Sequence, residues 1–117
     1  AQCVKGNCHR GHGTFNWESG HVYAGSWSDG LPSGYGDFFY DNGDSYKGQF
    51  VKGKKTGNGR YTWNNGNYYD GSWGDDKANG RGKYHWAKEG ATFEGYFKDG
   101  QITNIEVGVA VETPEKD

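Results

Sequence analysis

The sequence predicts an all-β fold: a single elongated, twisted antiparallel meander sheet built from tandem 23-residue β-hairpins, with no helices. Sixteen of the twenty aromatic residues fall into four columns that recur every 23 residues, and nineteen of the 22 glycines fall into five more. A fixed period of this length indicates a repeat array rather than a globular enzyme. Within each unit, two short runs alternate with period two between glycine-containing loops, which is typical of hairpin strands.

The repeat is clearest in residues 23–45, which read Tyr-Ala-Gly-Ser-Trp, a loop with one glycine, Gly-Tyr-Gly-Asp-Phe-Phe-Tyr and Asp-Asn-Gly. We predict that the array covers residues 1–104 as a partial unit, three full units and a half unit: 3–22, 23–45, 46–68, 69–92 and 93–104. Residues 105–117 are predicted to form a capping strand and a polar tail. The strand would carry Ile105, Val107, Val109 and Val111, and the tail would run from Thr113 to Asp117.

Alternation assigns the side chains of each unit to two faces. Tyr23, Gly25 and Trp27 share one face, whereas Ala24 and Ser26 point to the other. A large ring from a neighbouring unit can lie across glycine backbone, because that backbone carries no Cβ. The aromatic face is therefore predicted to be the packed face of a strongly twisted sheet.

Glycines also mark the connections between the predicted strands. Three loops end in a glycine that can take positive φ, as three-residue hairpin loops require: 18–20, 41–43 and 64–66. The fourth loop, 87–90, is one residue longer, which predicts a bulge or a looser turn. Loops at the other edge, such as 28–33 and 51–56, are expected to be longer. Asp76 replaces a glycine of the other units, which predicts a distorted loop there.

Composition excludes several classes of protein. A net charge of −2 over 117 residues gives no support for binding to nucleic acid. No stretch approaches the roughly 20 apolar residues needed to cross a bilayer. The first residue is Ala1 rather than Met, so the chain is expected to begin as a mature or trimmed product. The core is expected to consist of Tyr, Trp and Phe side chains.

Cys3 and Cys8 are the only cysteines, and they flank the turn-like sequence Lys-Gly-Asn. Across a tight hairpin their Cα atoms can approach the distance that a disulfide needs. We therefore predict a disulfide that fastens a terminal strand, with two free thiols as the alternative. A disulfide implies an oxidising compartment, so the protein would be secreted, periplasmic or at the cell surface.

Two constellations invite a chemical interpretation. His9 and His12 lie near the cysteines, but the spacing is not a usual structural-zinc pattern, so polar loop residues beside a disulfide are favoured. The sequence contains enough carboxylates for a general acid–base pair. Most of them lie at turns, where an Asp side chain accepts hydrogen bonds from nearby backbone N–H groups. They are Glu18, Asp29, Asp41, Asp44, Asp75 and Asp76. We predict no metal, no cofactor and no enzyme activity.

Residues outside the columns supply two candidate binding surfaces. Four aromatic residues point by alternation to the face opposite the columns, where exposed rings favour a partner: Tyr35, Phe39, Tyr68 and Tyr96. The alternative is that they pair across strands and cover a polar face. The only basic cluster is a candidate lipid-headgroup site, with a solvated turn as the favoured alternative because three charges are few: Lys52, Lys54 and Lys55.

One pattern recurs at 23-residue spacing over about residues 3–104: Tyr-x-Gly-x-Trp/Phe, then Gly, then Gly-x-Gly-x-Phe/Tyr-x-Tyr/Trp, then Gly. This pattern closely resembles the MORN repeat (membrane occupation and recognition nexus). The resemblance implies a non-catalytic module that acts as a scaffold, dimerises, or contacts proteins or membrane lipids. Many bacterial members have no assigned role. The motif residues build the fold, so the resemblance transfers no active site.

Three functions follow in order of preference. The first is a non-enzymatic scaffold that binds a protein partner or a copy of itself, since open sheet edges recruit further strands. The second is peripheral binding to membrane lipid through the lysine cluster. The third is binding of glycans or cell-wall saccharides through exposed rings, which ranks last because the Trp and Tyr columns are expected to belong to the core.

Overall fold

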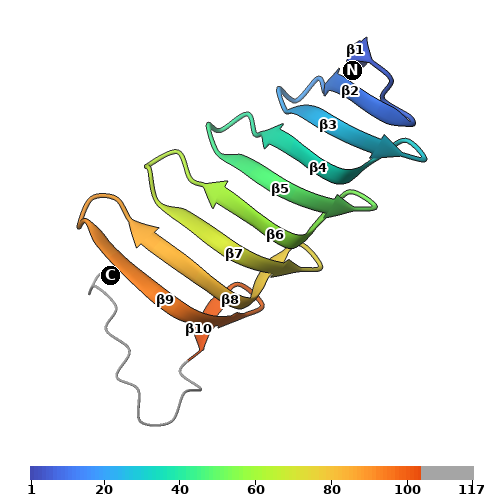
Figure 1. The fold of residues 1–117 in the computed structure, drawn as a ribbon. Coiled ribbons are helices and arrows are strands. Elements are labelled where there is room, and N and C mark those ends of the chain that lie inside the picture. Colours follow the sequence, from blue (N-terminus) through green and yellow to red (C-terminus); the bar gives the residue numbers. More distant parts are fainter. Residues whose placement is uncertain (104–117) are drawn as a thin grey trace.

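The structure is a computed structural model in which residues 1–103 are described. They form one ten-stranded sheet, and each strand is hydrogen-bonded to the strands before and after it in the sequence (Figure 1). The strands are β1 (Gln2–Gly6), β2 (Gly11–Asn16), β3 (Val22–Ser28), β4 (Leu31–Phe39), β5 (Ser45–Val51), β6 (Lys54–Thr62), β7 (Tyr68–Gly74), β8 (Lys77–Trp86), β9 (Ala91–Lys98) and β10 (Gln101–Thr103). The predicted all-β meander is confirmed. Within residues 1–103 no helix is long and apolar enough to cross a membrane.

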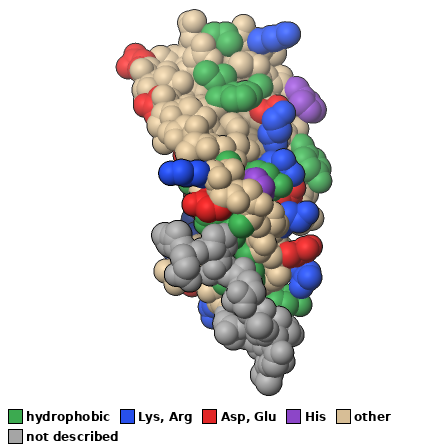
Figure 2. All heavy atoms as spheres, turned by 90° about the vertical axis from the view of Figure 1, so that its left-hand side faces the viewer, with side chains coloured by type: hydrophobic (Ala, Val, Ile, Leu, Met, Phe, Trp, Pro, Cys, Tyr) green, Lys and Arg blue, Asp and Glu red, His purple; other side chains and the backbone are tan. Residues whose placement is uncertain are grey.

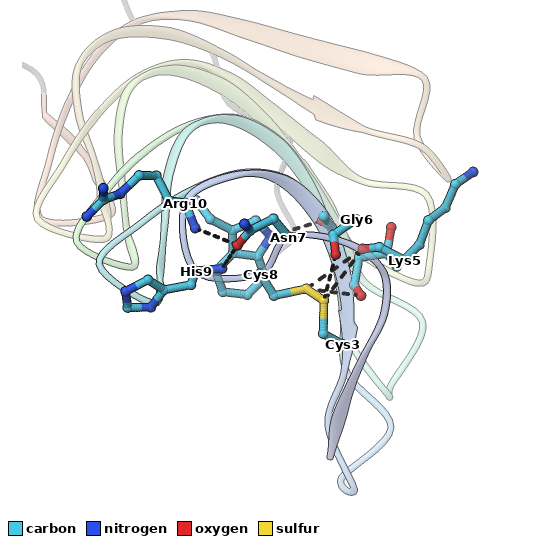
Figure 3. The surroundings of a disulfide bond; sticks show 10 residues. Cys3, Lys5, Gly6, Asn7, Cys8, His9 and Arg10 are labelled. Carbon is cyan, nitrogen blue, oxygen red and sulfur yellow. Dashed lines mark hydrogen bonds between the residues drawn. A yellow bond between two sulfur atoms is a disulfide. The ribbon is translucent and has the colours of Figure 1, made fainter.

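The sheet is long, narrow and strongly curved. Its described part measures 49 × 26 × 16 Å, and successive hairpins follow the same open curve when seen nearly end-on (Figure 3). The strand register shifts between Gly25 and Trp27 of β3, and again at corresponding places on β5 and β7. Such bulges bend a strand and increase its twist. Their repetition in every unit accounts for the regular curvature.

The three-residue hairpin loops are confirmed. Gly20, Gly43 and Gly66 have φ angles of +104°, +96° and +96°, and each N–H donates to the carbonyl three residues earlier at 2.9–3.1 Å. The longer loop at 87–90 is looser, as predicted, because the N–H of Gly90 reaches back four residues, to Trp86, at 2.9 Å.

The opposite edge does not contain the longer loops that we predicted. Asp29 and Gly30 alone join β3 to β4, with φ angles of +52° and +75°. Two-residue turns with positive φ at both positions match the twist of the flanking strands, and the same turn recurs in every later unit. The prediction of a distorted loop at Asp76 is also wrong. Asp76 takes the same conformation, with φ of +74°, because Asp tolerates the left-handed region better than most residues.

The core is a column of tyrosine rings that lie on glycine backbone. Tyr46 is fully buried, and its hydroxyl donates to the carbonyl of Gln49 at 3.0 Å. A Cβ on Gly59 of the adjacent strand would overlap this ring. Gly59 belongs to the same unit as Tyr46, so the prediction that the ring comes from a neighbouring unit is wrong. Tyr23 and Tyr69 repeat the arrangement one unit earlier and one unit later. Burying a large apolar side chain stabilises a fold by roughly 1.5–3 kcal/mol, so this column contributes substantially to the stability of the array.

Hydrogen bonds also join each hairpin to the next at both edges. At the two-residue turns, the N–H groups of Gly53, Asp76 and Gly100 donate to carbonyls of the preceding hairpin at 2.9–3.0 Å. At the three-residue loops, the carboxylate of Asp44 accepts from the N–H of Asn64 at 2.8 Å. Each unit is therefore positioned by its neighbours, as expected for a repeat array.

Cys3 and Cys8 form the predicted disulfide, with 5.8 Å between their Cα atoms (Figure 3). Strand β1 pairs only with β2, and all five of its residues are exposed. Burial therefore contributes little to holding β1, and the disulfide ties it to the following turn. In that turn, the Asn7 side chain accepts from the N–H groups of His9 and Arg10 at 2.9 Å each.

The array ends on β10, which pairs with β9 over three residues. The capping strand predicted with Ile105, Val107, Val109 and Val111, and the tail predicted from Thr113 to Asp117, lie outside the described residues.

Candidate functional site

The aromatic face carries two kinds of ring. The first kind is buried: Tyr23, Trp27, Tyr46, Phe50, Tyr69, Trp73, Phe93 and Phe97. The second kind lies on the same face but is only partly buried, because the sheet has a single layer: Phe15, Trp17, Phe38, Tyr40, Tyr61, Trp63, Tyr84 and Trp86. We call these eight half-buried residues the aromatic trough. The prediction that the aromatic face is packed holds for the first kind alone.

The trough is an unbroken series of rings along the stacking direction. Consecutive centroids are 4.6–5.6 Å apart from Phe15 at one end to Trp86 at the other. These spacings are those of interacting aromatic pairs. The trough is therefore a continuous apolar surface supported by the buried columns.

Asp44 fixes the middle of the trough from the loop edge. Its side chain is buried, with one oxygen accepting from the Tyr61 hydroxyl at 2.7 Å and the other from the N–H of Asn64 at 2.8 Å. Burial, and then the bond to this carboxylate, raise the pKa of Tyr61 well above its ordinary value. Tyr61 consequently remains a neutral hydrogen-bond donor at physiological pH.

Lys55 occupies an aromatic cage beside the trough. Its side chain is only 13% exposed, and its Nζ lies 3.0 Å from Asp76 Oδ1. The same Nζ donates to the Tyr40 hydroxyl at 3.4 Å. Burial alone would raise the pKa of Asp76, but the backbone N–H and the ammonium of Lys55 outweigh it and hold that pKa below its usual value. Four ring centroids surround the ammonium at 5.5–6.0 Å, within cation–π range: Tyr40, Tyr46, Tyr61 and Trp73.

A cavity of about 410 Å³ opens on the aromatic face one unit further along. Its walls include Trp63, Tyr69, Tyr84 and Phe97, and Ala78 lies in its lining. Cavities of roughly 300–1,000 Å³ hold small molecules in proteins, so this cavity is a candidate pocket on the aromatic face.

The four outer aromatic residues lie on the opposite face but are not brought together. Tyr35 and Phe39 both lie on β4 and are 66% and 44% exposed. Tyr68 lies on β7 and stacks against His85, with 5.0 Å between the ring centroids. Tyr96 lies on β9 beneath an arginine side chain. Tyr68 and Tyr96 are therefore partly covered, and several strands separate them from the first pair.

The lysine cluster is divided rather than concentrated. Lys55 points into the aromatic cage, and Lys54 pairs with Asp75 at 3.0 Å. Lys52 lies at a turn with φ of +50°. Unlike Lys54 and Lys55, it forms no ion pair with any of the described residues. Figure 2 shows charges of both signs scattered over the visible side of the molecule.

The scattered carboxylates have structural partners in the fold. Asp41 lies 3.7 Å from His21 Nδ1, and Glu18 lies 3.5 Å from the N-terminal amine. Asp29 occupies the first position of a two-residue turn. In the part of the chain that the structure describes, no three His, Cys, Asp or Glu side chains are grouped as a metal site requires.

Sequence reasoning missed the trough and the cavity. Alternation correctly assigned these rings to the aromatic face, but it does not say whether a second layer covers that face. A signal was present in the columns themselves. The Tyr23 ring extends over the glycine backbone at Gly36, whereas Phe38 pairs across the strands with Tyr23, so only the first ring is sealed by backbone.

The comparisons with known proteins agree with this architecture. A family model for the MORN repeat matches three consecutive segments, 23–45, 46–68 and 69–90, which together make up more than half of the chain. No curated protein matched the chain in a sequence search. The family is known as a non-enzymatic repeat module for interaction with proteins or membrane lipids. Each matched segment corresponds to one hairpin unit of the sheet, and the chain belongs to the MORN-repeat family.

Proposed function

We propose that this chain is a non-catalytic scaffold that holds a segment of a partner protein along the aromatic trough. The observation that carries the proposal is the unbroken row of eight half-buried rings on a face that the described residues leave open. Large exposed apolar surfaces on soluble proteins usually mark interaction sites. Tyr and Trp are also the residues most enriched at the energetic centres of protein interfaces.

The rigidity of the trough supports the same function. Its rings rest on buried columns, with Phe38 4.6 Å from Tyr40 and 6.1 Å from the fully buried Tyr23. Side chains that are already ordered lose little rotational freedom on binding. An extended partner segment, or a second copy of the chain, gains contact area along the whole row at low entropic cost.

Two further expectations belong to this proposal. The disulfide supports a location in an oxidising compartment, which means secreted, periplasmic or at the cell surface. Membrane attachment through Lys52, Lys54 and Lys55 has less support, because two of these three lysines are paired with aspartates. Lysines paired with aspartates leave little net charge to attract an anionic bilayer.

The test compares matched double variants of the two faces. Trp17→Ala with Trp86→Ala removes one ring from the first pair of trough rings and one from the last pair. Tyr35→Ala with Phe39→Ala removes the most exposed rings of the outer face. Binding is measured by capture from a native extract and by sedimentation at several concentrations, which also detects self-association. We expect the trough variant to bind at least about tenfold more weakly, since removing an interface hot spot costs about 2 kcal/mol or more.

The outer-face variant is expected to bind as the unchanged protein does. Loss of binding in that variant alone would place the contact surface on the outer face. A strict monomer that captures no protein would contradict the scaffold function itself.

A further inference from the structure

The cage that surrounds Lys55 recurs one unit further along without its lysine. In the repeat register Ala78 stands where Lys55 stands, since Lys55 pairs with Phe50 and Ala78 pairs with Trp73. The equivalents of the four cage rings all line the 410 Å³ cavity: Trp63, Tyr69, Tyr84 and Phe97. The second cage is therefore open because a methyl group replaces the lysine side chain.

The open cage keeps the aromatic walls of the occupied cage but loses both of its hydrogen-bond acceptors. The ammonium of Lys55 is held by the Tyr40 hydroxyl and the Asp76 carboxylate. The repeat equivalents of these residues are Trp63 and Gly100, and neither has a side-chain oxygen. Asp76 itself borders the cavity, but its Oδ1 is already bound to Lys55 through both the backbone N–H and the ammonium.

This difference selects one kind of cation. A primary ammonium has three N–H donors that must be satisfied, and leaving them unpaired in a cavity is unfavourable. A quaternary ammonium has no donor and is held by ring faces alone, which is how aromatic cages bind such groups. The open cage therefore fits a trimethylammonium group better than an amine.

Lys77 defines the rest of the ligand. Lys77 is one of the residues that line the same cavity, at the start of β8 beside the turn, and it forms no ion pair with any residue in 1–103. The charge of Lys55, which also borders the cavity, is offset by Asp76 at 3.0 Å. A bare cation would be repelled by Lys77, whereas a ligand with an attached phosphate is attracted at both ends.

We propose that this cavity binds phosphocholine, with the trimethylammonium group among Trp63, Tyr84 and Phe97 and the phosphate at Lys77. The site lies on the aromatic face, and the lysine cluster at residues 52–55 is not the group that binds its phosphate. The site shares Trp63 and Tyr84 with the trough, but the ligand titrations test it without a protein partner, so the failure of one proposal is distinguishable from the failure of the other. Phosphocholine is offered both by soluble esters and by lipid headgroups, and the two sources present the same atoms to the cavity.

The primary experiment is a titration with phosphocholine and with phosphoethanolamine, followed through the NMR signals of the Phe97 and Tyr84 rings. The two ligands share the phosphate and differ only in methylation of the ammonium. We expect phosphocholine to bind at least about tenfold more tightly, because only its cation is satisfied by ring faces. Equal binding of the two ligands would overturn the proposal.

Variants test the site in opposite directions. Ala78→Lys places in the open cage the side chain that fills the first cage, and it is expected to abolish binding. Lys77→Gln, at an exposed position, is expected to weaken phosphocholine several-fold while leaving choline, which has no phosphate, no weaker. Phosphocholine binding that is unaffected by both changes would contradict the assignment of the cavity.

A conversion variant tests the reason for the selectivity. Trp63→Tyr with Gly100→Asp restores the two acceptors that hold Lys55, and an added Cβ at Gly100 meets no atom within 4 Å. We expect this variant to shift the preference towards phosphoethanolamine. An unchanged preference would show that missing acceptors are not the cause.

Vesicle sedimentation distinguishes the two sources of the ligand. Vesicles of phosphatidylcholine are compared with vesicles of phosphatidylethanolamine and phosphatidylglycerol. Selective pelleting with phosphatidylcholine that is lost in Ala78→Lys would identify a lipid headgroup as the source. Binding to soluble phosphocholine without pelleting would identify a soluble ester and exclude the membrane source.

Discussion

Replacing Gly59 with alanine is expected to lower the free energy of unfolding by about 3 kcal/mol, as forced overpacking of a core does. The new Cβ would overlap the hydroxyl and ring carbons of Tyr46, which is fully buried. The ring cannot move aside without breaking its hydrogen bond to the carbonyl of Gln49. Chemical denaturation of the purified variant measures the effect.

Gly74→Ala provides the matched control on a neighbouring strand. There an added Cβ meets only the side chain of Asn79, with 3.2 Å to its Nδ2. Asn79 is exposed, so it can adjust at little cost, and we expect a change within about 0.5 kcal/mol. Equal destabilisation by the two alanines would mean that ring-on-glycine packing does not hold the array together.

Stability is expected to fall steeply above about pH 10. Burial raises the pKa of both Tyr23 and Tyr69 to about 12. In the unfolded chain both hydroxyls titrate near pH 10. A raised pKa favours the neutral form in the fold, so the full stabilisation is present below pH 10 and is lost as the pH rises towards 12.

Tyr23 and Tyr69 alone contribute roughly 5 kcal/mol to the loss between about pH 10 and pH 12, because each contributes about 1.4 kcal/mol per pH unit. Tyr61, whose pKa is also raised, adds to this loss. Denaturant midpoints across this range, read beside the ultraviolet absorbance of tyrosinate, measure it. Tyr23→Phe should flatten the dependence, and Phe93 shows that phenylalanine occurs naturally in this column. A midpoint that stays constant up to about pH 12 would contradict the burial of these hydroxyls.

Much of the fold was predictable because the same pattern of aromatic residues and glycines occurs in several units of the sequence. The alternation of Tyr23, Gly25 and Trp27 fixed the strands and their faces, and Gly20 and its equivalents fixed the three-residue loops. Because each feature occurs in several units, a single irregular residue does not change the predicted pattern. The disulfide was predictable because the separation of Cys3 and Cys8 fits a tight hairpin.

The other edge was not predictable from glycine positions alone. Lys52 and Asp76 take positive φ without being glycine, so the two-residue turns were mistaken for longer loops. A longer loop would include Lys55, but this residue lies in β6 and faces the aromatic rings. Its ammonium was interpreted as a surface charge for that reason.

The candidate site was hidden for a different physical reason. Period-two alternation gives the direction of Phe38 and Tyr84, but burial depends on what lies above them in space. A single-layer sheet seals only those rings that reach over backbone, such as Tyr46 over Gly59. The open cage depended further on comparing Lys55 with Ala78, and these residues become equivalent only once the strand pairing is known.

Hydrogen exchange of the five tryptophan indole N–H groups tests most directly whether the aromatic face is half sealed and half open. The indoles of Trp27 and Trp73 are buried and donate to the carbonyls of Gly13 and Gly59 at 2.9 Å each. The remaining three tryptophans belong to the half-buried trough: Trp17, Trp63 and Trp86. We expect two slowly exchanging indole signals and three fast ones, with the fast ones slowed when a partner binds. Five equally protected signals would show that the trough is covered in the isolated protein, and five fast signals would show that the buried columns do not form.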